Sequence, residues 1–218
     1  MALKQTKNIR QPVEASPEGD TDSRKLPTFW PDILRNASRT IQVKKGAMLF
    51  RRGDKAKGIY WVEKGQVRLQ RYAPDGTEIV LHRAGKGDYL AEASLSSRSY
   101  HCDALCTKDA QLFLLPSPVL ATCIRDDADF AIAWTNALSR NLRAVRVRLE
   151  RSSLKSARDR ILHYLVSEVG AEGCVTLTQP ITAWAAELGI AHETLYRTLA
   201  ELEKGGTIEK RGRTIQLA

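Results

Sequence analysis

The pattern of apolar residues changes along the chain, and this change limits the folds that the sequence can adopt. Over residues 41–115, short runs alternate apolar and polar residues, and glycines interrupt them at short intervals. Such alternation is typical of β-strands with one buried face that are joined by tight turns. Residues 117–169 contain no glycine and only one proline, Pro118, which favours long helices. The sequence therefore predicts an α+β protein that begins with an antiparallel β jelly roll or sandwich.

A narrow apolar stripe runs along the middle of the helical stretch. Its members recur in steps of four and three residues, as in the a/d seam of a coiled coil over about two heptads. The stripe consists of Leu138, Leu142, Val145 and Leu149. We expect residues 126–153 to form a long dimerisation helix whose seam packs on a second copy; the alternative is a helix that lies on its own domain. The same stretch carries five arginines, for which three interpretations stay open: a solvated face, contacts with acidic groups of a partner subunit, or the lining of a pocket for an anionic ligand. These residues are Arg140, Arg143, Arg146, Arg148 and Arg151.

The C-terminal segment "ITAWAAELGIAHETLYRTLAELEK" predicts a first helix over about residues 180–188, a turn at Gly189 and a second helix over about residues 192–204. Glu193 and Arg197 stand one helical turn apart on the second helix, where an ordinary surface helix would pair them as a salt bridge. In a helix-turn-helix the same face enters the major groove of DNA, where Arg donates to guanine and Glu accepts from cytosine. The side chains expected to contact DNA from this helix are His192, Glu193, Thr194, Tyr196 and Arg197.

Several basic residues surround a glycine near the C-terminus of the sequence. Lys210, Arg211 and Arg213 surround Gly212, where we expect a short hairpin that serves as a wing and contacts phosphates. Residues 154–218 would then form a winged helix-turn-helix. The net charge of +9 is consistent with a polyanionic partner such as double-stranded DNA, although an acidic membrane surface would fit the same number.

In this order, a sandwich, a long helix and a winged helix-turn-helix resemble the Crp/Fnr family of bacterial transcription regulators. "KGAMLFRRGDKAKGIYWVEKGQVRL" is similar to the family's first sandwich strands, and "HETLYRTLAELEKGGTIEKRGRTIQL" is similar to its recognition helix and wing. The resemblance covers residues 43–218. It implies an effector-binding sandwich over residues 28–125, a homodimer, a palindromic operator and RNA polymerase as a further partner. It also implies that Glu193 and Arg197 match the family's Glu-x-x-x-Arg base-reading pair, with a G-A step in each half-site.

The effector site departs from the pattern of the cyclic-AMP-binding members. Those members hold ribose and cyclic phosphate with a Gly-Glu pair and an Arg-Ser pair, which fall here at Ala91-Glu92 and His101-Cys102. A neutral His is a poor substitute for an Arg that binds a buried phosphate with two hydrogen bonds. The sequence therefore argues against cyclic AMP and leaves another small-molecule effector, or none. The candidate pocket residues are Glu92, Arg98, His101, Cys102, Val145 and Arg146.

The cysteines bear on the other kinds of sensing known in the family. The first 101 residues contain no Cys, which argues against an iron–sulfur cluster near the N-terminus. We expect Cys102 and Cys106 to lie on one strand about 13 Å apart, too far for a disulfide, as small buried residues. His101 next to Cys102 could bind haem, but adjacent strand residues point to opposite faces. A haem- or redox-responsive regulator therefore stays an alternative, and no metal site is predicted.

Three further expectations concern the whole chain. A cupin-type metalloenzyme would need a His-x-His strand, whereas this region offers only His82 and His101, so we expect no enzyme. No apolar run approaches about 18 residues and the N-terminus lacks a signal-peptide pattern, which predicts a cytoplasmic protein without membrane contact. Residues 1–27 are polar, of mixed charge and without periodicity, which predicts a disordered tail.

Overall fold

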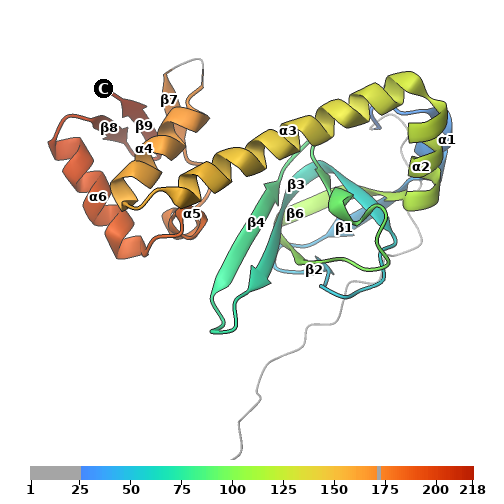
Figure 1. Ribbon diagram of the computed structural model, residues 1–218, viewed down its shortest axis with the longest axis horizontal. Coiled ribbons are helices and arrows are strands. Elements are labelled where there is room, and N and C mark those ends of the chain that lie inside the picture. The colour runs from blue at the N-terminus through green and yellow to red at the C-terminus, as the bar shows by residue number, and fades with distance from the viewer. Residues whose placement is uncertain (1–25, 171–172) are drawn as a thin grey trace, which may run out of the picture. The chain divides into compact units, whose positions relative to one another are not determined.

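The computed structural model describes residues 26–170 and 173–218, and the chain divides into two compact units, Met1–Ala137 and Leu138–Ala218. Figure 1 shows the β-strands of the first unit, the long helix α3 and the small helical unit at the C-terminus. Among the described residues, no helix is both long and apolar enough to span a bilayer.

The first unit is built on antiparallel strands that follow the alternating part of the sequence. The strands are β1 (Arg39–Val43), β2 (Met48–Phe50), β3 (Gly58–Tyr72), β4 (Glu78–Ala84), β5 (Tyr89–Leu90) and β6 (Asp103–Pro116). Their order is β1-β6-β3-β4, with β2 paired to β6 and β5 paired to β3, and every pairing is antiparallel. This confirms the predicted N-terminal sandwich. The helices of this part are α1 (Asp32–Ala37), the short η2 (Glu92–Ser94), α2 (Ser117–Asp126) and α3 (Ala128–Ser153).

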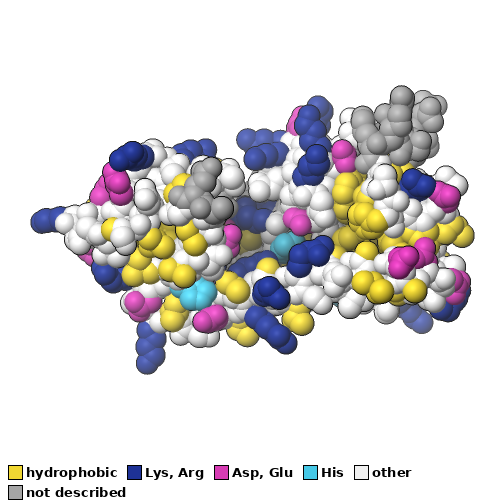
Figure 2. All heavy atoms as spheres, turned by 90° about the horizontal axis from the view of Figure 1, so that it is seen from above, with side chains coloured by type: hydrophobic (Ala, Val, Ile, Leu, Met, Phe, Trp, Pro, Cys, Tyr) yellow, Lys and Arg dark blue, Asp and Glu magenta, His cyan; other side chains and the backbone are white. Residues whose placement is uncertain are grey.

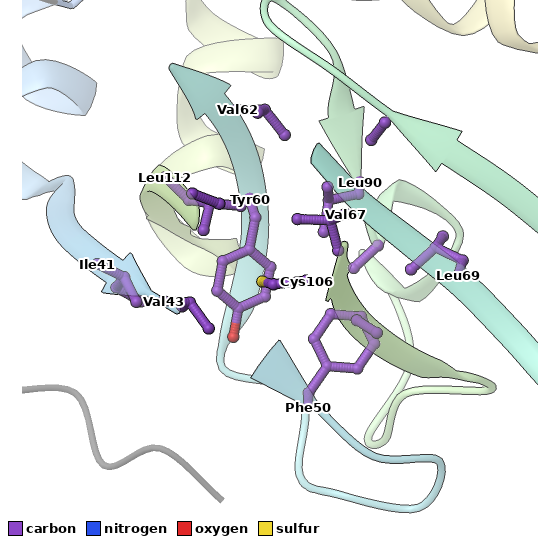
Figure 3. Close-up of a cluster of buried hydrophobic side chains, with 14 of the residues drawn as sticks. Ile41, Val43, Phe50, Tyr60, Val62, Val67, Leu69, Leu90, Cys106 and Leu112 are labelled. Carbon is purple, nitrogen blue, oxygen red and sulfur yellow. The ribbon is translucent and has the colours of Figure 1, made fainter. Parts of the chain in front are cut away.

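Aliphatic side chains and three aromatic rings fill the inside of the sandwich (Figure 3). Phe50 stacks on Tyr100 with ring centroids 3.9 Å apart and on Tyr60 at 5.6 Å. The Tyr100 hydroxyl donates to the carbonyl oxygen of Gly58 at 3.1 Å, so the buried oxygen is satisfied. Burial raises the pKa of Tyr60 far above its ordinary value, so its hydroxyl stays neutral.

A second apolar cluster joins the helices to the outer side of the sandwich. Trp30 meets Trp61 and Phe113 edge to face, and its indole N–H donates to the Tyr89 hydroxyl at 2.9 Å. Trp134 of α3 packs its ring against Tyr89 at 4.8 Å. Contacts of this kind bury much apolar surface and explain why the first turns of α3 belong to the first unit.

Helix α3 continues beyond this cluster into the second unit. Phe130, Trp134 and Ala137 are buried, residues 142–146 are all exposed, and Arg151 is buried again. The predicted helix over residues 126–153 thus begins two residues later, at Ala128. Of the predicted disordered tail, residues 1–25 lie outside the described residues, whereas Leu26 is buried in the second apolar cluster.

The second unit contains the predicted helix-turn-helix and its hairpin. Its further elements are α4 (Ala157–Glu168), β7 (Cys174–Thr176), α5 (Ile181–Leu188), α6 (His192–Lys204), β8 (Ile208–Arg211) and β9 (Thr214–Leu217). The three strands form a sheet in the order β7-β9-β8. Trp184 of α5 and Leu195, Leu199 and Leu202 of α6 are buried in the core of this unit.

Candidate nucleic-acid interface

The turn between α5 and α6 is held by a glycine and an arginine. Gly189 adopts φ 65°, a left-handed conformation that ends α5 without the strain that a side chain would bring. Arg160 of α4 donates from Nη1 to the carbonyl oxygens of Gly189 at 3.0 Å and Leu188 at 3.4 Å, and from Nε to Leu154 at 2.8 Å. The angle at which α6 leaves the turn is therefore fixed by a hydrogen-bond network that the sequence did not reveal.

Helix α6 presents one apolar and one polar face. Leu195, Thr198, Leu199 and Leu202 are buried, which leaves the opposite face open to solvent. The predicted DNA-reading residues His192, Glu193, Tyr196 and Arg197 are exposed on that open face, and Thr194 is half-buried. The structure thus brings together the side chains that the spacing had suggested.

Glu193 and Arg197 do not pair with each other; each contacts another neighbour on α6. The Glu193 Oε1 lies 2.9 Å from His192 Nδ1, and Arg197 Nε lies 3.9 Å from Glu201 Oε1. His192 also meets the Tyr196 ring edge to face at 5.9 Å. These contacts are solvent-exposed and individually weak, so both side chains can leave them when a base edge approaches.

The wing is the β8–β9 hairpin, whose turn contains Gly212 at φ 62°. Arg211 donates from Nε and Nη2 to Glu209 at 3.0 Å and 2.7 Å, and Lys210 is half-buried. Arg213 donates from Nη2 to the backbone carbonyl of Gln179 at 2.6 Å. Arg213 therefore anchors the wing to the segment before α5, a role for which the sequence pattern carries no signal.

Basic side chains protrude at several separate places on the face shown in Figure 2, with acidic side chains among them. Charge alone therefore does not mark a binding face. The DNA-contact assignment depends instead on the exposed face of α6 and on the hairpin that follows it.

Part of the predicted effector pocket gathers next to η2 in the first unit. Ala91 adopts φ 68°, a left-handed conformation that is unusual for a residue with a side chain. The His101 ring nitrogen Nε2 lies 2.9 Å from the Ala93 carbonyl oxygen and 3.2 Å from Ser94 Oγ. Because a carbonyl oxygen only accepts hydrogen bonds, Nε2 is the protonated nitrogen and donates a hydrogen bond to the Ala93 carbonyl oxygen. This hydrogen bond holds the imidazole against η2.

Arg71 of β3 belongs to this site, although the sequence did not identify it. Its Nε donates to the His101 carbonyl oxygen at 2.9 Å, and its charge also acts on the Cys102 thiol. Burial is the largest cause that raises the pKa of Cys102, and Asp103 and Glu92 raise it further, whereas Arg71 lowers it. A cation is thus present beside the His101-Cys102 pair, in a position set by the pairing of β3 with β6.

The other predicted pocket residues are exposed side chains. Arg98 is exposed, and its carbonyl oxygen accepts from the Ala56 N–H at 3.0 Å. Val145 and Arg146 are exposed on the part of α3 that belongs to the second unit. Among the described residues, no three His, Cys, Asp or Glu side chains are grouped so that they could hold a metal ion.

The prediction that Cys102 and Cys106 share one strand is wrong. Strand β6 begins at Asp103, and Cys102 belongs to the bend before it. Cys106 lies inside the sandwich (Figure 3), and burial raises the pKa of its thiol to about 12. All four cysteines are free thiols.

The fold and the α6 face define a class: regulators with a cyclic-nucleotide-binding type of sandwich and a helix-turn-helix unit. Residues 40–127 match the cyclic nucleotide-binding domain family. A probable transcriptional regulator, flp, of Lacticaseibacillus casei is 30% identical over 190 residues, which cover 81% of each chain. The structure of a CRP/FNR-family regulator from Thermus thermophilus superposes with a TM-score of 0.60 at 25% identity, covering 83% of this chain and 93% of that one.

A fold likeness extends over nearly the whole chain. A CooA mutant from Carboxydothermus hydrogenoformans gives a TM-score of 0.73 at 17% identity and covers 94% of this chain and 93% of its own. The chain belongs to the Crp/Fnr family of bacterial transcription regulators.

Proposed function

We propose that the chain acts as a homodimeric, sequence-specific regulator, and not as an enzyme, by reading a palindromic DNA site with α6. The observation that carries this proposal is the exposed face of α6, with Glu193 and Arg197 one turn apart. Arg197 can donate two hydrogen bonds to guanine O6 and N7, and Glu193 can accept from cytosine N4. Arg211 at the wing tip is exposed and suited to the phosphate backbone.

The apolar stripe of α3 supports the dimer. The stripe residues are Leu138, Leu142, Val145 and Leu149, whose exposed fractions are 37%, 51%, 53% and 65%. Exposed leucines at heptad spacing are the surface that a second, identical helix buries in a parallel coiled coil. Two copies joined there would present their α6 helices to successive major grooves, about 34 Å apart along the DNA.

The η2 region supports an effector other than cyclic AMP, or none. The donor that would have to meet a cyclic phosphate is replaced by His101, whose Nε2 already donates to Ala93. Arg71 leaves a positive charge near the site, so an anionic ligand of another shape stays compatible with it. The high pKa of the Cys106 thiol argues against redox sensing at that residue, because only the thiolate reacts.

The test is selection of bound DNA from a random pool by the purified full chain, with sequencing of the enriched fraction. The expected result is an inverted repeat with a G-A step in each half-site. Enrichment of single, unrepeated sites would contradict the dimer, and no enrichment would contradict DNA reading by α6. Parallel selections with reductant, with haem and with cyclic AMP separate the alternatives. A redox-responsive regulator would enrich different DNA only when reductant is added, a haem-responsive regulator only with haem, and a cyclic-AMP-responsive regulator only with cyclic AMP.

A further inference from the structure

A buried arginine joins the end of α3 to the DNA-binding unit. Arg151 lies in the last turn of α3 and is 3% exposed, whereas Arg140, Arg143 and Arg146 on the same helix are exposed. Burying a guanidinium is costly unless other groups compensate its charge and its hydrogen bonds. The groups that contact the Arg151 guanidinium therefore indicate why an arginine is buried at this position.

Three side chains of α4 surround the guanidinium. Its Nη2 donates to Ser167 Oγ at 3.0 Å and lies 3.9 Å from Glu168 Oε1. Its central carbon lies 4.6 Å from the centroid of the Tyr164 ring, which is a cation–π contact. Planar stacking and a hydrogen bond in a fixed direction define both the position and the orientation of the guanidinium.

Tyr164, which stacks on Arg151, also contacts the first helix of the helix-turn-helix. The Tyr164 ring meets Trp184 of α5 at 5.3 Å with an interplanar angle of 60°, and Trp184 is fully buried. Packing at native density transmits a shift of one such ring to its neighbour. The last turn of α3 is thus connected through Tyr164 to the first helix of the helix-turn-helix.

The compensation of the buried charge is incomplete. Arg151 Nε makes no hydrogen bond among the described residues, and its ion pair with Glu168 is long. Burial lowers the pKa of the Arg151 guanidinium, while the charges of Glu187 and Glu168 raise it. Ser167 and Glu168 are both exposed, so water solvates them when the guanidinium is replaced by an apolar side chain of similar length, and no charge is left buried without a partner. We therefore expect such a replacement to cost little stability. Stability alone therefore does not explain an arginine here.

We propose that Arg151 is a positioning residue: it fixes the direction of the last turn of α3 against α4 and α5, and thereby sets the half-site spacing that the dimer accepts. The inference depends on the proposed function, because a spacing exists only for two copies on one inverted repeat. Removal of the guanidinium frees the last turn of α3 to rotate against the helix-turn-helix. A dimer with that freedom binds repeats of several spacings with similar affinity.

The test uses the full chain and a set of inverted repeats that share the selected half-site and differ by one or two base pairs in spacer length. For the wild type we expect affinity to fall about tenfold when the spacer changes by one base pair, since spacing is a geometric property of such dimers. For Arg151→Met we expect a fall of less than about threefold, with the thermal midpoint little changed. Arg140→Met, on an exposed part of the same helix, is the matched control and keeps the wild-type profile.

A second variant covers the case in which Arg151→Met fails to fold. Ser167 is exposed, so Ser167→Ala keeps the fold and removes the acceptor of Arg151 Nη2; we expect an intermediate spacing profile. A wild-type spacing profile in the folded Arg151 variant, or in Ser167→Ala where that variant is unfolded, overturns the inference, as does a wild type that tolerates every spacer. A wild type that binds no inverted repeat overturns the proposed function and this inference with it.

Discussion

Arg197 has the clearest expected role among the single residues. It is exposed on α6, and its contact with Glu201 at 3.9 Å is long enough to be released at little cost. We predict that Arg197→Ala weakens binding to the selected site by about 1–3 kcal/mol, because one bidentate contact to guanine is lost. Titrations of cognate and random DNA at several salt concentrations check this. Binding to random DNA should change little, and equal losses on both DNAs would contradict base reading by Arg197.

Arg160 is a residue whose importance is visible only in the structure. Its guanidinium donates to carbonyl oxygens at the turn before α6 and in the connection between α3 and α4. We predict that Arg160→Ala lowers the free energy of unfolding by about 1–3 kcal/mol, since these carbonyl acceptors lose their donor. Urea unfolding measures this, with Arg158→Ala, an exposed neighbour on α4, as the control. Equal midpoints for both variants would exclude the capping role.

The thiols differ in how easily they react. Cys102 and Cys174 are half-buried, whereas Cys106 and Cys123 are buried. Because burial raises the pKa of the Cys106 thiol to about 12, this thiol stays protonated, and therefore unreactive, throughout the range from pH 7 to about pH 10. We predict that a thiol-specific reagent modifies Cys102 and Cys174 first and Cys106 only on unfolding. Mass spectrometry of time points identifies the sites, and early modification of Cys106 would contradict its burial.

At the scale of the element, the exposed stripe of α3 leads to a prediction about assembly. Leu142 is central in the stripe and 51% exposed in the single chain. A carboxylate at this position would face its own copy across the seam and repel it. We predict that Leu142→Glu yields a monomer in sedimentation experiments and weakens binding to an inverted repeat at least about tenfold, because two half-sites no longer bind together. The Arg140→Glu variant should remain dimeric; a dimeric Leu142→Glu chain would contradict the seam.

The elements also show which parts of the fold the sequence could predict. Helix α6 begins and ends at the predicted residues, because a strong apolar period, an acidic first turn and two glycines after Lys204 define it locally. The break between α2 and α3 was not predicted. It occurs at Asp127, whose carboxylate accepts from the Phe130 N–H at 2.8 Å and caps α3. Strand β7 was also missed, since three residues are too few for a period and the strand exists only because β9 pairs with it.

In the candidate site, too, the sequence predicted the residues that one helix places and missed the residues that long-range contacts place. The α6 residues come from one helix, so their spacing was sufficient to place them on one face. Arg71, Arg160 and Arg213 act through contacts with residues 28 or more positions away along the chain. Such contacts depend on strand register and on helix packing, and no pattern in a single sequence reports them.

At the scale of the whole molecule, each of the two units has its own core, and each core contains tryptophan whose fluorescence reports its unfolding. Trp30, Trp61 and Trp134 are buried in the first unit, and Trp184 is buried in the second. We predict that fluorescence-detected unfolding of the wild type and of Trp184→Phe gives different curves, whose difference reports the second unit alone. Circular dichroism on the same samples is the comparison. Coincident transitions by every probe would mean that the two units unfold as one.

The middle of α3 has a consequence for how the protein responds to its own abundance. Residues 142–146 are exposed all around the helix, so none of the residues that the structure describes packs on this segment. Most of the stability of a helix in a protein comes from packing on other elements, so a helical segment that lacks such packing is only marginally stable in water. Ordering of the segment and association of two copies would then be a single event, and the amount of competent regulator would rise more steeply than the amount of protein synthesised.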